Sequence, residues 1–489
     1  MVHFVARRRR QWFGLVAGLA TSMDFLNNAT VNFAESAIRG GLGVSSGEFL
    51  WVLTAYAVAG ALGIALLERL NRVMHPRDLL LGGMALFVIG ALCASLAETL
   101  PQLIAARVIQ GLGGGPLLTC CRVLVQLAVP PERRPRQLRG FMLGLFLFSA
   151  PGSWLAALLI ESGDWHALFV LHAAAGALVW LAVWAVLPRG PHATRDLGHL
   201  DPWALLALSS GVLVWMHTLE DLRDQPLDSG TLLRLGVGLA LFAVLFRRLR
   251  RHPDPWFKLD TLASRRYLAG LGFYTLYYLL NGAMALLLPR YLLSGEAFDL
   301  LNTGRLTSLG AAATALALPL YFRFSRRLPD RRYVIATGFL LFAGVSFWLA
   351  RVATGETAWA QLLPVVLLKG LFPILVVFQV AGLTFGEFKG LDYAHAYAMK
   401  NVLRLLANAI GAGVADVYWQ DIAAKSRTAL VGRLDAAALG APADPAAWLS
   451  LSQAVDRQVA LICASQSFII VATVSLLGAV LIVRQKHLS

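Results

Sequence analysis

The chain has 489 residues, of which 57% are hydrophobic and only 15% are charged, and its formal net charge is +15. Apolar stretches of about 20 residues recur along the whole sequence, with the charges confined to the gaps between them, which excludes a soluble globular protein and indicates a polytopic membrane protein. The positive charge does not predict nucleic-acid binding, because Lys and Arg gather in the connections between apolar stretches.

We therefore expect an all-α integral membrane protein with 14 spans. The spans cover residues 12–34, 49–67, 79–97, 102–127, 140–160, 166–187, 202–219, 233–250, 267–289, 303–322, 333–351, 360–385, 395–419 and 461–483. Lys and Arg are concentrated in alternate connections, beginning with the run Arg7 to Arg10 before the first span. Because positively charged connections stay in the cytoplasm, both termini are expected there, with the chain in the inner or plasma membrane.

The first span carries polar residues that a lipid-facing helix would not tolerate. Asp24, Asn27, Asn28 and Asn32 share one face when successive residues advance by about 100°. A charge near the bilayer centre costs on the order of 3 kcal/mol, so this face is expected to line a wet cavity in which the asparagines contact a ligand. The alternative is that the asparagines bind neighbouring helices by interhelical hydrogen bonds.

Asp24 is the titratable residue of this face. A proton carrier needs an acid that water can reach from alternate sides of the membrane, so Asp24 could couple proton movement to transport. The other interpretation is an acid that stays ionised and pairs with a cytoplasmic arginine. Glu35, near the outer end of the same helix, is expected to form a solvated ion pair with Arg39 one turn away.

Arg107 lies within the fourth span, where an embedded cation is costly. Its fork of donors could hold a carboxylate or the backbone carbonyls freed around the glycine-rich turn that follows; a brace between helices is the alternative. The sequence "GLGGGP" that follows is not a phosphate loop, because no strand precedes it and no lysine follows it. The glycines expected to permit close helix contact and conformational change are Gly111, Gly113, Gly114 and Gly115.

The chain divides into three parts. Residues 1–187 are expected to form one six-helix bundle, 188–260 a linker with two extra transmembrane helices, and 261–489 a second six-helix bundle with a long outer loop at 420–460. A faint internal repeat relates "ARVIQGLGGG" to "LLKGLFPIL", each of which places a cation and a glycine at the same depth. Paired repeats of this kind build the central cavity of many secondary transporters.

The last block carries three embedded charges, Lys369, Arg404 and Asp416. If all three face the cavity, they favour an anionic or zwitterionic substrate over a lipophilic cation. Asp416 lies near the outer end of its span, where a solvated position is the alternative. The aromatic run at 273–280 could stack against a ring-bearing ligand or serve packing alone.

Several of these stretches also occur in a known family. "RVIQGLGGG" from Arg107, "WVLTAY" ending at Tyr56, "TVNFA" from Thr30 and "NVLRLLANAIGAG" from Asn401 are together specific, and over nearly the whole chain the sequence resembles the 14-span drug:proton antiporters of the major facilitator superfamily. The resemblance implies two six-helix bundles with two additional central helices. It also implies that Tyr56 and Gln110 belong to the substrate cavity, and that Arg107 is the family's proton-relay arginine and so has a part in proton coupling.

The sequence departs from the family pattern at three places. The first-span acid of the family corresponds to Asn27, and Asp24, one turn nearer the cytoplasm, is the available substitute. The loop after the second span reads "ERLNRVMHPRD", in which Arg72 takes the place of an aspartate. The glycine and proline of the family's fifth span are replaced by Ser153 and Trp154.

The expected function is export of a small organic molecule, a drug or toxic compound, by alternating access with proton antiport. The proton gradient would be the energy source, without a cofactor or metal, and a periplasmic adaptor protein is a possible partner. Nothing in the sequence has the spacing of a metal site or of a nucleophile and base, so an enzyme is not expected. Two alternatives stay open: a dedicated exporter of one metabolite such as a siderophore-like product, and a non-transporting membrane sensor or assembly partner.

Overall fold

The computed structural model describes residues 7–188, 201–221, 228–253, 255–259, 262–324, 330–384, 388, 390–434 and 445–485. Every regular element in these residues is a helix, so the expected all-α class is confirmed. The first nine α-helices are α1 (Arg7–Phe33), α2 (Glu35–Leu42), α3 (Ser46–Val73), α4 (Pro76–Ala94), α5 (Leu100–Gly114), α6 (Leu117–Ala128), α7 (Arg134–Ser149), α8 (Gly152–Glu161) and α9 (Ala167–Val186), with a 3₁₀ turn η1 (Pro131–Arg133) before α7.

The second part of the chain begins with a helical hairpin and continues with longer helices. Its elements are α10 (Pro202–Asp221), α11 (Ser229–Arg251), α12 (Arg265–Arg290), the π-helical turn η2 (Tyr291–Gly295), α13 (Leu300–Phe324), α14 (Arg331–Val352), α15 (Trp359–Lys369), α16 (Phe372–Leu375), α17 (Val377–Thr384), α18 (Gly390–Val431) and α19 (Pro445–Arg484).

Three expected spans are broken into shorter helices: 102–127 and 140–160 into two each, and 360–385 into three. Pro116 precedes α6 and Pro151 precedes α8. Proline has no N–H to donate and its ring clashes with the carbonyl four residues earlier, so it interrupts the hydrogen-bond ladder of a helix. The break after α5 lies directly beyond the glycine-rich run, which places an irregular backbone at mid-span.

Ten helical stretches among the described residues are long and apolar enough to cross a membrane. The other expected spans, on α1, α10, α13 and α18, are also helices, each at least 20 residues long. The structure is therefore that of a multi-pass membrane protein.

The segment expected as a long loop at 420–460 is largely helical. Helix α18 continues to Val431 and α19 begins at Pro445, with 435–444 outside the described residues. Both extensions are rich in alanine, the strongest helix former, and Arg427 of α18 pairs with Asp456 of α19 at 2.6 Å. The two helices therefore continue as a pair where the sequence pattern predicts a loop.

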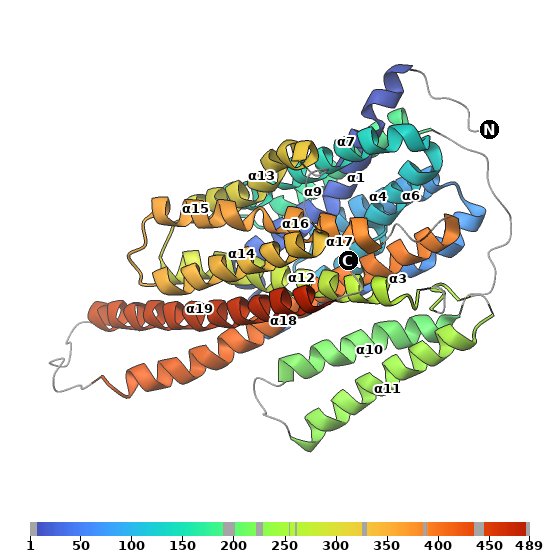
Figure 1. Ribbon diagram of the computed structural model, residues 1–489. Helices are drawn as coiled ribbons and strands as arrows, with labels where there is room; N and C mark the ends of the chain where they lie inside the picture. The colour runs from blue at the N-terminus through green and yellow to red at the C-terminus, as the bar shows by residue number, and fades with distance from the viewer. Residues whose placement is uncertain are drawn as a thin grey trace.

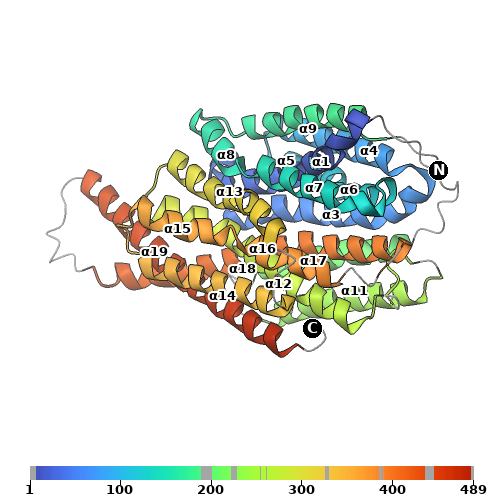
Figure 2. The same cartoon turned by 45° about the horizontal axis from the view of Figure 1, so that its top comes forward.

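The helices form two groups, which we call the N-terminal group (α1–α9) and the C-terminal group (α12–α19). They meet where α3 packs against α18 and where α8 packs against α13. The α10–α11 hairpin lies beside both groups, and α10 contacts α3 and α18 (Figure 1). Figure 2, turned by 45°, shows the N-terminal group above the C-terminal group, with the ends of α18 and α19 extending past it at the left.

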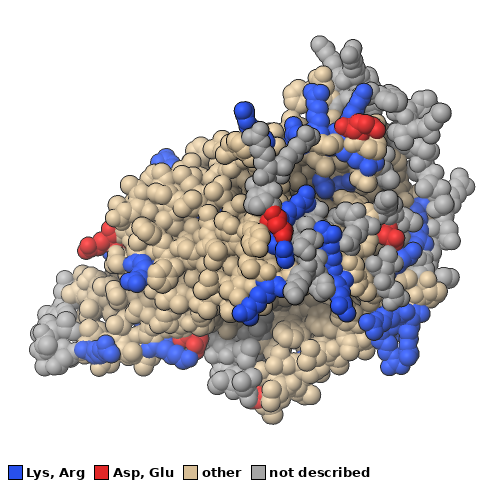
Figure 3. Space-filling view, viewed as in Figure 1, with Lys and Arg blue, Asp and Glu red and all other residues tan. Residues whose placement is uncertain are grey.

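The surface is divided by charge. Figure 3 shows a broad uncharged area over the middle and left of the molecule, with most of the visible Lys and Arg side chains toward the end at which the chain begins. An uncharged band with a basic margin is the surface that a lipid bilayer and its aqueous boundary require.

Candidate functional site

A central cavity of about 300 Å³ lies between the two groups of helices. This volume is within the range of small-molecule sites in proteins. Its polar and charged lining residues include Asn28, Asn32, Tyr56, Arg122, Asn281, Lys369, Lys400, Arg404 and Asn408. Its larger aromatic lining residues include Phe25, Phe141, Tyr274, Tyr277, Tyr278, Phe342, Phe372, Phe378 and Tyr397.

Asp24 is fully buried next to this cavity and pairs across the two groups. Arg404 Nη2, from α18, donates to Asp24 Oδ2 at 2.7 Å. Tyr56 Oη, from α3, donates to Asp24 Oδ1 at 2.7 Å, and Asn28 Nδ2 donates to the same oxygen at 3.2 Å. The carboxylate thus joins α1, α3 and α18, and its charge is balanced by a single arginine of the other group.

Arg107 is also fully buried, but it does not contact Asp24. Its Nη1 donates to Asn27 Oδ1 at 2.7 Å and to Gln110 Oε1 at 2.6 Å. Its guanidinium lies 4.2 Å from the centroid of the Tyr56 ring, a cation–π contact. The arginine therefore holds two amides and the ring whose hydroxyl binds Asp24.

The four glycines predicted for close contact pack directly against α3 and α4. A Cβ atom built on any of them would lie between 2.2 and 2.4 Å from a neighbouring atom, which no real side chain can tolerate. The contacts are Gly111 with the carbonyl of Tyr56, Gly113 with the carbonyl of Gly83, Gly114 with the hydroxyl of Tyr56, and Gly115 with the Cα of Gly60. This packing fixes the ring of Tyr56 beside Arg107.

The predicted cavity residues separate into two sets. Asn28, Asn32, Tyr56, Lys369 and Arg404 line the central cavity. They come from α1, α3, α15 and α18, so both groups of helices contribute to one wall of polar side chains.

The other three residues assigned to the cavity from sequence lie elsewhere. Asn27 and Gln110 are fully buried against Arg107. Successive helical residues are turned by about 100°, so the side chain of Asn27 points toward α5 while that of Asn28 points into the cavity. Asp416 lies at the far end of the bundle, where its carboxylate pairs with Arg290.

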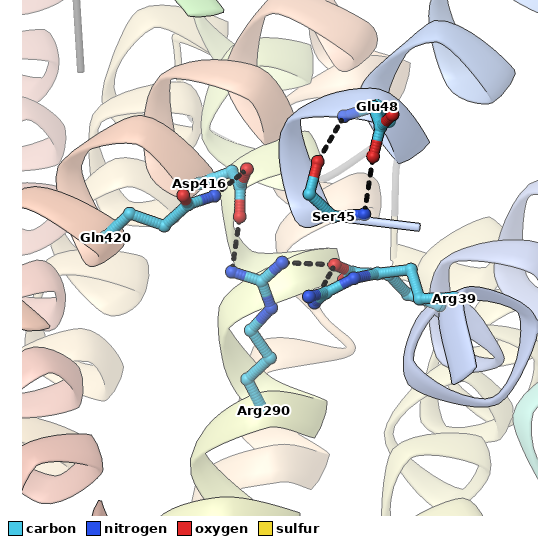
Figure 4. Close-up of polar contacts among 7 residues, drawn as sticks. Arg39, Ser45, Glu48, Arg290, Asp416 and Gln420 are labelled. Atoms are coloured by element: carbon cyan, nitrogen blue, oxygen red, sulfur yellow. Dashed lines mark hydrogen bonds and ion pairs between the residues drawn. The ribbon is translucent and has the colours of Figure 1, made fainter. Parts of the chain in front are cut away.

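The pair between Arg290 and Asp416 belongs to a larger cluster, which we call the Arg290 network (Figure 4). Arg290, at the end of α12, binds Glu35 of α2 and lies 2.5 Å from Asp416 of α18. Arg39 lies 3.5 Å from Glu35, and Gln420 Nε2 donates to Asp416 at 2.6 Å. Glu35 is only 5% exposed, so the expected solvated pair with Arg39 is wrong: the acid is buried between two arginines.

Two charged residues of the cavity, Arg122 and Lys400, are not among those predicted from sequence. Lys400 Nζ lies 4.5 Å from the ring centroids of both Tyr274 and Tyr397. Arg122 Nη2 donates to Tyr393 Oη at 3.3 Å. The signal was present, because Lys400 precedes Arg404 by one helical turn in an otherwise apolar span.

Known proteins resemble this chain both in sequence and in fold. The family model described as Major Facilitator Superfamily matches residues 17–412. The Probable multidrug resistance protein EmrY of Escherichia coli K12 is 24% identical over 83% of this chain and 79% of its own length, and the Multidrug export protein EmrB of the same organism is 26% identical over the same shares. A solved bacterial homologue of the human drug peptide transporters superimposes with a TM-score of 0.65 over 97% of this chain and 98% of its own, at 13% identity.

Proposed function

The chain belongs to the major facilitator superfamily, and on that premise we propose that it exports a small organic molecule by alternating access, driven by proton antiport. The names of the similar proteins, multidrug resistance and multidrug export, support a drug or another toxic compound as the substrate. The central cavity between the two groups supports alternating access, because a site between paired bundles can be exposed to either side in turn.

The observation that carries the proposal is the buried ion pair between Asp24 and Arg404. When Asp24 is ionised, its charge holds Arg404 and therefore holds α1 to α18. Binding of a proton would remove that charge, release Arg404 and loosen the contact between the two groups. Loss of the proton on the other side of the membrane would restore the pair, so that one proton moves inward for each complete cycle.

Arg107 has a supporting part in this scheme. It holds the Tyr56 ring at 4.2 Å, and Tyr56 in turn donates to Asp24 at 2.7 Å. A shift of Tyr56 on protonation of Asp24 would therefore change the contacts of its ring with Arg107 and with the glycines of α5. Arg107 is in this view a coupling residue that acts through Tyr56.

We propose that the protein crosses the inner membrane 14 times and that both of its termini lie in the cytoplasm. The ten long apolar stretches together with α1, α10, α13 and α18 support this count. The basic side chains gathered toward the N-terminal end support a cytoplasmic position for that end (Figure 3). The Arg290 network then faces the outside.

A periplasmic adaptor protein is a possible partner of this exporter. Helix α18 has 42 residues, which at about 1.5 Å per residue makes it longer than the bilayer is thick. The paired extensions of α18 and α19 therefore project beyond the membrane (Figure 1) and are the surface we propose for such a contact.

Transport by purified protein in liposomes with an imposed pH gradient tests the proposal. Across a panel of drugs and small metabolites, we expect at least one compound to move against the proton flow. Asp24→Asn and Arg107→Ala should each reduce the gradient-driven part about tenfold or more, by removing the coupling between the sites. Asp421→Asn, in an exposed ion pair on the α18 extension, is the control and should transport normally.

Each negative outcome has its own meaning. Transport that ignores the gradient would exclude proton coupling, and unchanged coupling in Asp24→Asn would remove that residue from the mechanism. No transport of any compound would favour the non-transporting sensor instead.

A further inference from the structure

Four cationic side chains line the central cavity, and none of its described lining residues is acidic. They are Arg122 of α6, Lys369 of α15, and Lys400 and Arg404 of α18. Lys400 and Arg404 are only 5% and 3% exposed, so neither charge is well solvated. Buried charges are tolerated when a counter-charge balances them, which raises the question of what balances this set.

Asp24 balances one of the four. It lies behind the cavity wall and binds Arg404 at 2.7 Å. Lys400 lies one turn before Arg404 on α18, a spacing at which like charges repel, and it interacts electrostatically with Arg122 of the opposite group as well. Arg404, Lys400 and Arg122 therefore concentrate positive charge in one part of the cavity wall.

Aromatic rings and a tyrosine hydroxyl are among the contacts of Arg122 and Lys400. The guanidinium of Arg122 lies 5.3 Å from the ring of Tyr397 and 5.7 Å from the ring of Phe141, and its Nη2 donates to Tyr393. Arg122 Nε and Nη1 are buried, and neither finds a hydrogen-bond acceptor among the described residues. Two donors of a cavity-lining arginine are thus left for an acceptor from outside the chain.

Part of the cavity wall is aromatic. Tyr277 and Tyr278 have ring centroids 4.8 Å apart, Tyr277 and Phe372 lie 4.7 Å apart, and Phe372 stacks on Phe342 at 4.0 Å. These rings line the same cavity as the cations. A flat or apolar ligand body gains contact area against such a surface, while its polar group is left to the charged side.

We propose that the central cavity binds an organic anion, with its acidic group between Arg122 and Lys400 and its apolar body against the Tyr277 wall. The proposal rests on the proposed export function and names the chemical class of its substrate. An arginine and a lysine can share a carboxylate or sulfonate, the first through its fork and the second as a point charge. Lys369 adds to the positive potential of the site, and a lipophilic cation would be repelled by it.

Three naphthalene probes of equal size and different charge test this assignment. They are 2-naphthoate, the neutral 2-naphthamide and the cationic 2-naphthylmethylammonium, each titrated into the purified full-length protein by calorimetry. We expect naphthoate to bind at least about tenfold more tightly than either of the others, as charge-assisted hydrogen bonds to a carboxylate predict.

Variants identify the residues. Arg122→Gln and Lys400→Gln should each weaken naphthoate binding about tenfold and leave naphthamide binding within about twofold, because only the charged contact is lost. Lys425→Gln, whose exposed lysine lies on the α18 extension, is the matched control and should bind all three probes as the parent does. If one cavity variant fails to fold, the other carries the test, and the thermal melting curve of each variant reports its folding.

Three results would overturn the proposal: tighter binding of the cationic probe, equal naphthoate binding in both cavity variants and the parent, or no saturable binding of any probe. Transport separates this failure from failure of the exporter itself. If liposomes export a cationic drug and not naphthoate, proton-coupled export would stand and the organic anion would be excluded as the substrate. Export of naphthoate in the parent, lost in Lys400→Gln, would support both.

Discussion

The ion pair between Asp24 and Arg404 joins helices of the two groups, α1 and α18. Both side chains are buried, and an ionised group removed from water costs several kcal/mol unless a partner compensates for it. Here the compensation consists of the ion pair at 2.7 Å and the hydrogen bonds from Tyr56 and Asn28. Each charge is therefore tolerated because the other is present.

A double-mutant cycle should reveal this dependence in the stability of the protein. Asp24→Asn alone leaves Arg404 buried without its carboxylate and should destabilise the fold by about 3–5 kcal/mol, as should Arg404→Gln alone. The double variant, Asp24→Asn with Arg404→Gln, removes both charges and should recover most of the loss. Thermal melting in detergent measures all four proteins. Losses that simply add would show that the two residues do not interact.

Sequence reasoning found Asp24 but not its partner. Helical periodicity identifies the face on which Asp24, Asn28 and Asn32 lie, and the cavity is on that face. The periodicity does not say which distant helix packs there, and Arg404 is 380 residues away along the chain. For the same reason the amide of Asn27, one position before Asn28, was assigned to the cavity although it binds Arg107.

At the scale of helices, the contact of α3 with the break between α5 and α6 positions the site. Gly60 of α3 and Gly115 approach so closely that backbone lies on backbone, and Gly111 meets the carbonyl of Tyr56. Glycine permits such an approach because it has no Cβ. The same approach places Tyr56 between Arg107 and Asp24.

Gly115→Ala tests this packing. The added Cβ would lie 2.4 Å from the Cα of Gly60, and backbone cannot move aside as a flexible side chain can. We expect a loss of about 1–3 kcal/mol or more in the free energy of unfolding, as for other overpacked positions. Gly82→Ala on α4 is the control, since nothing lies within 4 Å of its Cβ, and its stability should be unchanged or higher. Equal melting temperatures for the two variants would contradict the close contact.

The helices themselves could be predicted in part. Length and hydropathy located the apolar segments, because every backbone group in a bilayer has to be bonded within the chain. The helical extension of α18 and α19 was missed, since hydropathy ends at the membrane boundary and helix propensity does not. The alanines of 420–431 and the contact between Arg427 and Asp456 continue the helices past that boundary.

Over the whole molecule, the two groups of helices are joined near both ends. At one end, Arg290 of the C-terminal group binds Glu35 of the N-terminal group. Toward the other end, Arg122 of α6 donates to Tyr393 of α18. Alternating access requires these links to break in turn, so each is a candidate determinant of the resting state. Composition and motifs predict the superfamily fold, but they do not predict these long-range contacts. Glu35 and Arg290 are 255 residues apart, and no pattern in the sequence shows that their helix ends meet.

Removal of Arg290 should shift the balance between the states. Arg290→Gln leaves Glu35 and Asp416 without the cation that joins them, so that the end carrying the Arg290 network should open more often. If the link contributes about 1.4 kcal/mol, opening becomes about tenfold more frequent. The readout is labelling of Asn32→Cys, a cavity position, by a membrane-impermeant thiol reagent, in a background from which the four native cysteines have been removed.

Arg39→Gln tests whether the effect of Arg290→Gln comes from the lost bond between the two groups or from the changed charge around Glu35. Arg39 contacts the same Glu35 at 3.5 Å, but both residues lie on α2, so this pair does not join the two groups. Labelling of Asn32→Cys should therefore rise in Arg290→Gln and stay within about twofold of the parent in Arg39→Gln, since a pair one turn apart within a single helix contributes little to holding the two groups together. An equal rise in both variants would mean that the charge on Glu35, rather than its bond to the opposite group, controls access to the cavity. No rise in either would show that other contacts between α1, α12 and α18 are sufficient to keep this end closed.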